Sequence, residues 1–409
     1  MSGNALEVKE VSLDYVTERH NAIAPPGFQL TEFGLIPEDW GIHNLGAIGE
    51  ALIGLTYRPS DVREHGTLVL RSSNIQDDSL AFEDNVYVNA DIPDRIRVRV
   101  GDVLICVRNG SRGLIGKSAY LDKRVEGETF GAFMGVFRSK LGKLASFYFQ
   151  SSTIKRQINE HLGATINQIT NKSLNSFRIA IPSNDEEQRA IATALSDVDA
   201  LLEGLDRLIA KKRDLKQAIM QQLLTGQTRL PGFEGEWHIK PLKAYCSLKS
   251  GESITSSKII LGGMYPCYGG NGLRGFTLTY THDGHYALIG RQGALCGNVL
   301  KVSGRFFASE HALVVTPSLD TDVGWLSVIL SQMNLNQYSE SSAQPGISAK
   351  KIVLLNIYGP ASKEEQGAIS NLLSEVDAEI QALEQRHTKT AALKQAMMQE
   401  LLTGRIRLI

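Results

Sequence analysis

The sequence predicts an α+β protein built as a tandem repeat, in which two mostly β domains are each followed by a long helix. Two observations lead to this prediction. Residues 182–231 and 360–409 are copies of one segment, aligned without a gap at an offset of 178, with about half of the positions identical. Residues 41–182 and 231–359 instead carry short apolar runs separated by Gly, Asn, Asp and Pro, which is the pattern of strands and turns.

The repeat also includes the start of each domain. Trp40-Gly-Ile-His-Asn-Leu45 recurs as Trp237-His-Ile-Lys-Pro-Leu242, in each case after a Pro-containing turn. The expected organisation is a lead-in segment, a first domain, a central helix, a second domain and a C-terminal helix, with the bounds 1–30, 31–182, 183–230, 231–360 and 361–409.

Apolar residues in the repeated segment recur at alternating steps of three and four, as on one face of a helix that packs along another helix. This seam consists of Leu195, Val198, Leu202, Leu205 and Ile209 in the first copy and of Val376, Ile380 and Leu383 in the second. We therefore expect the two helices to pair as an antiparallel coiled coil with pseudo-twofold symmetry. The alternative is that each helix covers only its own domain. Lys212 and His387 interrupt the seam and leave room for other proteins to dock there.

Start and stop signals agree with this period. Asn184 to Glu187 and Ser362 to Glu365 match the capping box, in which the first side chain accepts from the helix N-terminus and the Glu reaches back. Gly226 and Gly404 suit the left-handed position after a helix end. A helix of roughly 40 residues is about 60 Å long, too long to belong to either globular domain, and acts as a spacer.

The intervening domains show strand-like runs at 67–71, 103–108, 286–290 and 311–316, and helix-like patterns near 144–161 and 323–338. The whole chain has a formal net charge of −1, but residues 41–182 carry +4 and residues 231–359 carry +2. This excess permits nucleic-acid binding through local patches without requiring it.

Composition also bears on localisation. The acidic N-terminus lacks the pattern of a secretion signal, and no apolar run reaches ~18 residues, so we expect neither secretion nor membrane association but a cytoplasmic protein. The four cysteines are scattered without CxxC spacing, which is typical of buried thiols in a reducing compartment.

The sequence shows no arrangement of catalytic residues, and we expect no catalysis and no bound cofactor. The stretch from Gly270 to Gly275 matches GxGxxG, but a strand rather than a helix is expected after it, so a dinucleotide site is rejected. His282 and His285 are expected in a turn without further ligands at a usual spacing, so no metal site is expected.

Two Gly-rich stretches follow strand-like runs at equivalent places, one from Arg108 to Lys117 and the other from Gly290 to Gly297. Glycine lets a backbone approach a bulky ligand closely, and neighbouring Arg or Asn side chains supply donors for phosphates or base edges. The alternative is that these loops only turn the chain between strands.

The chain resembles the specificity (S) subunits of Type I restriction-modification systems over essentially its whole length. Thr31 to Trp40 resembles the family's lead into a target-recognition domain, and Glu187-Gln188 and Glu365-Gln366 resemble its entry to each spacer helix. Leu215 to Gly226, repeated at Leu393 to Gly404, is similar to the way those helices end. The loops 265–272 and 290–293 are similar to loops of its recognition domains.

The resemblance implies a non-catalytic subunit that reads double-stranded DNA. Each target-recognition domain would read one half of a bipartite sequence, and the helical rod would set the gap between the halves. The implied partners are two methylation subunits, which use AdoMet to methylate adenine, and restriction subunits, which use ATP and Mg²⁺. A rod of about 60 Å separates two readers by at most about 18 base pairs.

Polar, cationic and aromatic residues on the Gly-rich loops and neighbouring turns are the candidates for DNA contact. In the first domain they are Tyr57, Arg58, Arg71, Ser73, Asn74, Arg108, Asn109, Ser111, Arg112 and Lys117. In the second they are Tyr268, Asn271, Arg274, Arg291, Gln292 and Gln344. Arg can pair with guanine, Asn or Gln with adenine, and Lys or Ser with phosphate. A packing role is the alternative for each residue, and a non-enzymatic scaffold or ligand-binding module with duplicated β domains is the alternative for the whole chain.

Overall fold

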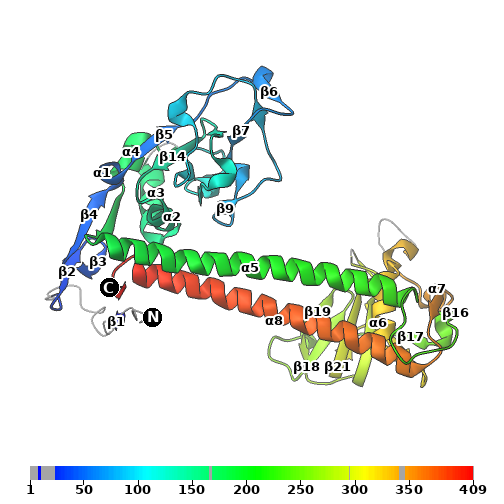
Figure 1. Cartoon of the computed structure of the whole chain (residues 1–409). Helices are drawn as coiled ribbons and strands as arrows, with labels where there is room; N and C mark the ends of the chain where they lie inside the picture. The colour runs from blue at the N-terminus through cyan, green and yellow to red at the C-terminus, as the bar shows by residue number, and fades with distance from the viewer. Residues whose placement is uncertain (1–7, 11–23, 165–167, 294, 340–345, 409) are drawn as a thin grey trace. The chain divides into compact units, whose positions relative to one another are not determined.

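The computed structural model describes residues 8–10, 24–164, 168–293, 295–339 and 346–408. It divides into two compact units, which are described separately: the first contains residues 1–204 and 387–409, and the second contains residues 205–386. Each unit combines one of the two domains with parts of the long helices α5 (Asp185–Leu224) and α8 (Lys363–Leu401), which are labelled in Figure 1.

The domain of the first unit is built on two four-stranded sheets. The antiparallel sheet has the order β12-β11-β14-β5, with bounds Ser118–Tyr120, Val103–Cys106, Met134–Arg138 and Glu50–Ile53. The second sheet has the order β13-β7-β10-β6, with bounds Thr129–Phe130, Thr67–Leu70, Tyr87–Val88 and Val62–Arg63. The predicted strands at 67–71 and 103–108 are confirmed as β7 and β11.

Shorter elements complete this domain. The paired strands are β2 (Phe28–Thr31) with β3 (Gly34–Pro37), β8 (Ile75–Gln76) with β9 (Ser79–Leu80), and β4 (Trp40–Asn44) with β15 (Arg178–Pro182). The helices are α1 (Leu45–Ile48), α2 (Gly142–Gln150), α3 (Ser152–Ala164) and α4 (Asn171–Ser176). The helix expected near 144–161 is therefore two helices with a break at Ser151.

The core of the first unit joins the domain to the long helices. Phe147 and Tyr148 of α2 are buried in one cluster with Leu195 of α5 and Met398 of α8. Each apolar side chain buried in this way contributes about 1.5–3 kcal/mol. Packing rather than helix propensity therefore fixes the ends of the long helices on this domain.

The second unit has one six-stranded sheet in the order β17-β22-β20-β21-β18-β19. The bounds are Cys246–Ser250, Ala312–Pro317, His282–Gly290, Val299–Ala308, Tyr265–Gly269 and Gly272–Thr277. Strands β16 (His238–Pro241) and β23 (Asn356–Gly359) pair separately. The strands expected at 286–290 and 311–316 lie in β20 and β22, so both predictions are confirmed.

Helices α6 (Val323–Gln332) and α7 (Ala349–Ile352) complete the second unit. The helix expected near 323–338 is α6 followed by a short 3₁₀ helix, Leu335–Tyr338. Trp325 of α6 is fully buried in a cluster with Leu223 of α5 and Leu373 of α8. The long helices are thus anchored in each unit by the same kind of apolar contact.

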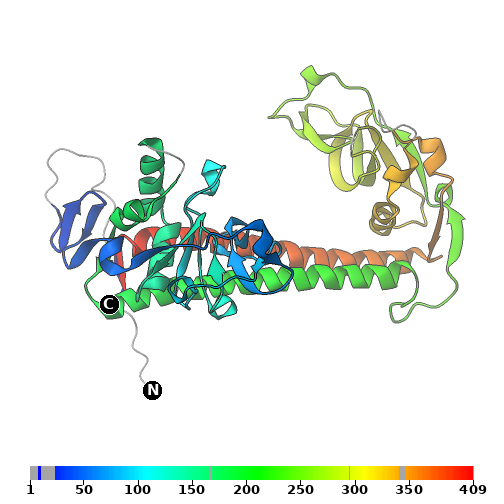
Figure 2. The same ribbon diagram turned by 90° about the horizontal axis from the view of Figure 1, so that it is seen from above.

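The long helices lie side by side and antiparallel in each unit, as Figure 2 shows. Leu195, Leu205 and Ile209 of the predicted seam are buried, as are Val376 and Ile380. The other seam residues, Val198, Leu202 and Leu383, are half-buried. The predicted seam residues are thus all buried or half-buried, and Leu195 also belongs to the core of the first unit's domain.

Two lysine–aspartate pairs fix the register of these helices. In the first unit Lys394 Nζ lies 2.7 Å from Asp199 Oδ1, and in the second Lys216 Nζ lies 2.6 Å from Asp377 Oδ1. The repeat offset of 178 maps Asp199 onto Asp377 and Lys216 onto Lys394. The two units therefore set the same antiparallel register, each through its own copy of one pair.

The capping boxes are only half formed. Asn184 Oδ1 accepts from the Glu186 N–H at 2.8 Å, and Ser362 Oγ accepts from the Glu365 N–H at 3.2 Å, but neither Glu187 nor Glu365 reaches back. The expected second half of each box is wrong, because both carboxylates are buried and bind an arginine that follows the other long helix.

These Glu–Arg pairs repeat the symmetry of the helices. Arg407 donates to Glu187 at 2.6 and 2.7 Å in the first unit, and Arg229 donates to Glu365 at 2.5 and 2.7 Å in the second. The offset of 178 again maps one pair onto the other. We call these two pairs the junction pairs. Charge-assisted bidentate bonds of this kind are strong and directional, so they hold each helix start to the opposite helix end.

Gly226 and Gly404 both have φ of +70°, so the predicted left-handed helix ends are confirmed. A Cβ on Gly226 would lie 3.2 Å from the Trp237 ring, and one on Gly404 would lie 3.2 Å from the Trp40 ring. The tryptophan at each domain start therefore packs on the end of a long helix, and only glycine satisfies both the backbone angle and the close approach.

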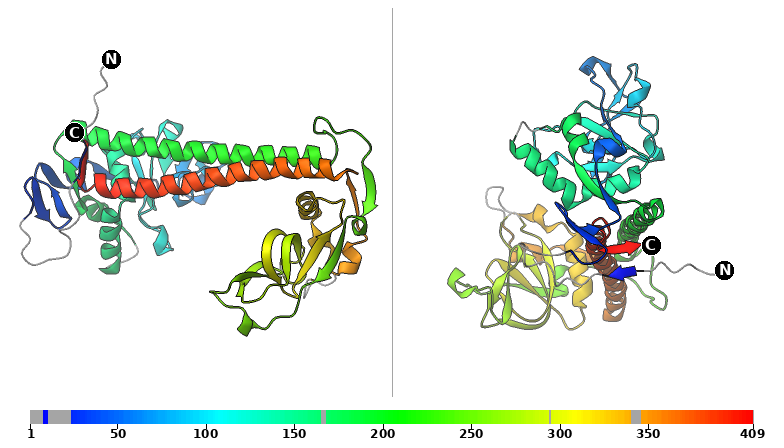
Figure 3. Two further views of the ribbon diagram at one scale, coloured as in Figure 1. Left: turned by 90° about the horizontal axis from the view of Figure 1, so that it is seen from below. Right: turned by 90° about the vertical axis from the view of Figure 1, so that its left-hand side faces the viewer.

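The N-terminal segment contributes β1 (Val8–Glu10), which pairs antiparallel with β24 (Ile406–Leu408) directly after α8. The right-hand view of Figure 3 shows these strands next to each other. Within the described residues, no helix is both long and apolar enough to cross a membrane.

Candidate nucleic-acid interface

The first Gly-rich stretch forms the connection between the antiparallel neighbours β11 and β12. At its start Arg108 is exposed, and its guanidinium carbon lies 5.2 Å from the centre of the Phe133 ring. Asn109 Oδ1 accepts from the Ser111 N–H at 2.9 Å, which stabilises the turn. The loop thus presents a cation stacked on an exposed aromatic ring, a combination that suits stacking on a nucleic-acid base.

A hollow of about 710 Å³ lies beside this loop. Its walls come from the segments after β5, around β7 and before β14, and four of the predicted contact residues line it, namely Tyr57, Arg71, Ser73 and Asn109. The remaining lining residues are Leu55, Thr56, Pro59, Val62, Ser72, Asp84, Val86, Gly131, Ala132, Phe133 and Met134. Residues far apart in the sequence therefore meet at one site, which we call the first hollow; its lining is mainly apolar and carries a few polar and aromatic side chains.

Arg71 is the best-positioned donor of the first hollow. Its Nη2 donates to Asp84 Oδ2 at 2.8 Å, and the two side chains are 34% and 67% exposed. A solvent-exposed pair of this kind adds little stability. Its effect is to hold a guanidinium in one orientation, which reduces the entropy lost when that group binds a base edge or a phosphate.

Asn74 is a correction to the sequence analysis. It is fully buried, and its Nδ2 donates to Ala81 O at 2.9 Å and to Asn85 Oδ1 at 3.0 Å. Its Oδ1 accepts from the Arg71 N–H at 2.9 Å. Because all of these bonds lie inside the domain, Asn74 shapes the turn that carries Arg71 instead of facing a ligand.

The other predicted residues of the first unit lie outside the lining of the first hollow. Arg58 and Ser111 are exposed and lie within two residues of lining residues in the sequence. Arg112 is also exposed, with its Nη2 3.5 Å from Asn159 O. Lys117 is half-buried. Burial raises the pKa of the Cys106 thiol, and the positive charge of Lys117 opposes that shift.

Phe133 and Asp84 were missed by the sequence analysis. Phe133 is 60% exposed although it directly precedes a buried strand. An exposed aromatic residue at a domain surface is a signal, but the sequence alone does not distinguish it from the buried Phe130 and Phe137 nearby. Asp84 has no sequence signal, because its role depends on a contact across 13 residues with Arg71.

In the second unit the two Gly-rich loops pack directly on each other. A Cβ on Gly270 would lie 2.8 Å from Gln292 O and 3.1 Å from His311 O, and one on Gly290 would lie 2.3 Å from Gly270 O. Only glycine allows these backbones to approach so closely. The turn between β18 and β19, which carries the exposed Asn271, therefore lies against the loop that carries Gln292.

Side chains around this contact are held by further bonds. Arg291 Nη1 donates to Ser250 Oγ at 3.0 Å, and Gln292 Oε1 lies 2.9 Å from His311 Nδ1. The structure thus brings Asn271, Arg291 and Gln292 together at the ends of strands β18 and β20 and adds His311, which the sequence did not point to.

The remaining candidates of the second unit lie elsewhere. Arg274 is exposed on β19, while Tyr268 on β18 is half-buried with its ring edge-to-face against Phe306 at 5.9 Å, which favours a packing role. Gln344 lies outside the described residues.

His282 and His285 do not lie in a turn as expected but on strand β20, where His282 stacks on Phe306 at 5.3 Å. Burial lowers the pKa of His282. Within the described residues no group of three or more His, Cys, Asp or Glu could hold a metal ion.

The thiols have the properties of structural residues. Burial raises the pKa of Cys246 to about 12, and the pKa of Cys267 is raised as well by burial. A thiol nucleophile needs a lowered pKa and access to solvent, whereas Cys246 and Cys267 are buried.

Each of the two compact units combines a domain rich in strands and Gly-rich loops with a share of one antiparallel helix pair, which defines a protein with an internal structural repeat. A comparison with known families agrees with this class. The family described as the Type I restriction modification DNA specificity domain matches residues 37–211 and 234–394, and the chain belongs to this family.

Known relatives share parts of the sequence. The specificity subunit of the Type I restriction enzyme EcoprrI from Escherichia coli is 42% identical over 148 residues, which cover 35% of this chain and 37% of that protein. The EcoKI specificity subunit of Escherichia coli strain K12 is 27% identical over 207 residues, 47% of this chain and 44% of that protein. The chain thus matches less than half the length of these relatives.

The fold is also similar to a solved structure. The crystal structure of the S subunit of a Type I restriction-modification system from M. genitalium superimposes with a TM-score of 0.61, at 17% sequence identity, over 88% of this chain and 96% of that one. At this identity the likeness establishes the fold.

Proposed function

We propose that this chain is the non-catalytic DNA-recognition subunit of a Type I restriction-modification complex. Each unit reads one half of a bipartite target in double-stranded DNA, and the helix pair sets the gap between the halves. The observation that carries the proposal is the duplication itself. Two units of one plan, each with Arg, Asn or Gln side chains on Gly-rich loops, suit the reading of two half-sites.

The first hollow supplies the chemistry for one half-site. Arg71, oriented by Asp84, and Asn109 can donate to base edges, while Arg108 on the Phe133 ring offers a stacked cation. In the second unit Arg291, Gln292 and Asn271 supply the same kinds of donor. The net charges of +4 and +2 in the two intervening segments favour contact with phosphates at both sites.

Because the proposed subunit carries out no catalysis itself, partner subunits would carry out the reactions. Two methylation subunits using AdoMet would methylate one adenine in each half-site, and restriction subunits would use ATP and Mg²⁺ for translocation and cleavage. The exposed faces of α5 and α8 are the surfaces on which the methylation subunits would dock. A cytoplasmic location follows from such a complex.

The first test is single-molecule sequencing of N6-methyladenine in the DNA of cells that express this chain with its methylation subunit. A bipartite methylated motif that disappears when this chain alone is omitted is the expected result. If the motif persists without the chain, while the methylation subunit is active, the proposal is wrong.

A second test addresses the gap. Deletion of residues 204–210 together with their repeat counterparts 382–388 removes two helical turns between Asp199 and Lys216 and between Asp377 and Lys394, so both register pairs can re-form. Each helix becomes about 10 Å shorter, and the gap should shorten by up to about 3 base pairs. Altered half-sites with an unchanged gap would contradict the spacer role.

A further inference from the structure

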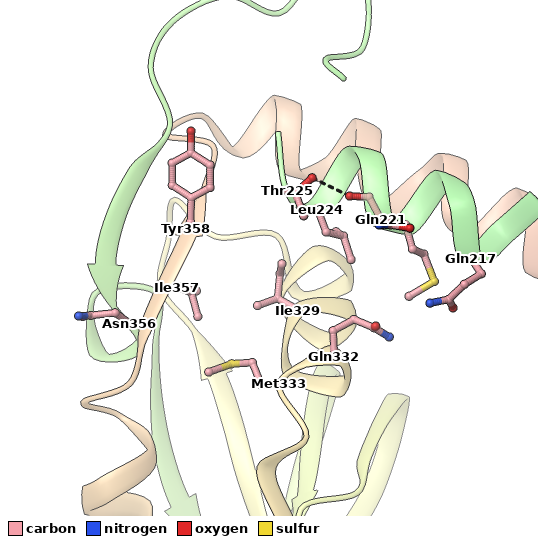
Figure 4. Close-up of a pocket in the computed structure, with 11 residues that line it drawn as sticks. Gln217, Gln221, Leu224, Thr225, Ile329, Gln332, Met333, Asn356, Ile357 and Tyr358 are labelled. Atoms are coloured by element: carbon pink, nitrogen blue, oxygen red, sulfur yellow. Dashed lines mark hydrogen bonds between the residues drawn. The ribbon is translucent and has the colours of Figure 1, made fainter. Parts of the chain in front are cut away.

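A second hollow, of about 510 Å³, lies in the second unit between the C-terminal turn of α5, helix α6 and strand β23. Figure 4 shows Leu224, Ile329 and Ile357 facing it from these three elements. Its lining residues are Gln217, Met220, Gln221, Leu224, Thr225, Ile329, Gln332, Met333, Asn356, Ile357 and Tyr358, all of them described and none of them charged. The hollow therefore has an apolar floor and a rim of side-chain amides, which suits an uncharged occupant.

The first unit shows what fills the corresponding place. Tyr148 of α2 is 2% exposed, and its hydroxyl lies within hydrogen-bond distance of the peptide oxygens of Ala180 and, at 3.3 Å, of Leu402. Leu402 is the repeat counterpart of Leu224, and Ala180 is the counterpart of Tyr358. In the first unit a phenol ring thus lies against the repeat counterparts of Leu224 and Tyr358, two residues that line the open hollow of the second unit.

Strand register supports this correspondence. Ala180 lies opposite Ile42 in the β15–β4 pair, and Tyr358 lies opposite Ile239 in the β23–β16 pair. Ile42 and Ile239 are at the same place in the repeated Trp-containing segments. The peptide carbonyl of Tyr358 therefore has the same position in the β23–β16 strand pair as the carbonyl of Ala180 has in the β15–β4 pair.

The helices α2 and α6 differ at the decisive position. Buried serines, Ser146 and Ser327, align the two helices, and this alignment places Ile329 where α2 has Tyr148. Isoleucine is shorter than tyrosine and lacks the hydroxyl, so Ile329 can neither fill the volume of a tyrosine nor donate a side-chain hydrogen bond to these carbonyls.

We propose that this hollow is a docking site for a tyrosine side chain of another protein chain. The ring packs among Leu224, Ile329 and Ile357, as Tyr148 packs in the first unit, and the hydroxyl donates to the peptide oxygen of Tyr358 or Leu224. The amides of Gln221 and Gln332 at the rim can bond the backbone of the docked segment. In the first unit the chain's own Tyr148 thus fills this place, and in the second unit the hollow accepts a tyrosine of a partner chain.

The test uses N-acetyl-tyrosinamide as the probe and the intact chain labelled at its Met and Ile methyl groups. Met220, Ile329, Met333 and Ile357 line the hollow and serve as reporters in methyl NMR spectra. We expect saturable shifts of these four methyl signals with a Kd on the order of 1 mM, as is usual for so small a ligand. N-acetyl-phenylalaninamide, which lacks the hydroxyl, should bind about 2- to 10-fold more weakly.

Two variants and one control complete the design. Ile329→Tyr fills the hollow from within, and Gln332→Trp closes its mouth from an exposed position that folding tolerates. Both should remove the probe-induced shifts, while Leu319→Tyr, at a position 92% exposed outside the lining, should leave them unchanged. Equal binding of the two capped amides, or shifts that persist in both filled variants, would overturn the proposal.

Free L-tyrosine distinguishes a protein tyrosine from a small metabolite. Its two charges cannot be matched by the uncharged rim, so it should bind more weakly than the capped amide. Tighter binding of the free amino acid would overturn docking of a protein segment. The experiment needs neither DNA nor a methylation subunit, so its result is independent of the proposed DNA recognition.

Discussion

The junction pairs are the features whose loss should be most costly to this fold. The Glu187 side chain is 0% exposed, and Arg407 is its only cationic partner among the described residues. The guanidinium of Arg407 is itself 17% exposed and also binds Asp39 at 2.8 and 3.0 Å. Arg407→Ala would leave a buried carboxylate without its cation. Breaking a buried pair in this way destabilises a protein by about 3–5 kcal/mol.

The symmetric variant Arg229→Ala should cost less, near the lower end of that range. Glu365 is 4% exposed, but it keeps the bond from Trp237 Nε1 at 3.3 Å after the arginine is removed. The matched control is Arg213→Ala, since Arg213 and Glu384 are 63% and 43% exposed and such a pair contributes about 0–1 kcal/mol.

The assay is urea unfolding at pH 7, followed by circular dichroism for the wild-type chain and the three variants. Since Arg407 lies in the first unit and Arg229 in the second, each variant should lower the stability of its own unit if the two unfold separately. A loss for Arg407→Ala no larger than that for Arg213→Ala would refute the argument that buried charge dominates at the junctions.

Three further predictions rest on single residues. Burial raises the pKa of Cys246 to about 12, so the stability that the neutral thiol contributes is complete below the ordinary thiol pKa and is lost as the pH rises toward 12. Relative to Cys246→Ala, the free energy of unfolding of the wild-type chain, measured by urea unfolding, should fall by about 1.4 kcal/mol per pH unit above pH 9. Arg71→Ala should weaken binding to the cognate DNA about 10- to 100-fold in fluorescence anisotropy, whereas Arg124→Ala, an exposed residue of the same domain outside the first hollow, should change it less than threefold. Gly404→Ala should lower the free energy of unfolding by about 1–3 kcal/mol, because φ is +70° and the added Cβ would lie 2.4 Å from Pro37 Cδ; an unchanged unfolding midpoint would show that the helix end shifts freely.

Local signals made the architecture readable from sequence. The period of Leu195, Leu205 and Ile209 and the left-handed Gly226 and Gly404 follow from rules that act within a few residues, and the structure has both. The role of Glu187 could not be read in this way. Its partner Arg407 lies 220 residues away, and a tertiary ion pair replaced the local cap that the sequence favours.

The candidate site was only partly predictable for the same reason. Loop composition drew attention to Arg71 and Asn109, which both line the first hollow. It could not distinguish Asn74, whose amide is used entirely inside the domain, from an exposed asparagine. Nor could it find Asp84 or Phe133, whose roles exist only once distant strands are assembled.

The positions of the cross-repeat ion pairs have a consequence for how such genes can change. Both lysine–aspartate pairs and both junction pairs lie wholly within residues 182–231 and 360–409. Recombination that replaces the sequence between two such segments exchanges a whole domain while leaving every one of these partners in place. A related chain can therefore receive a different domain without any change to the residues that set the register of the two long helices.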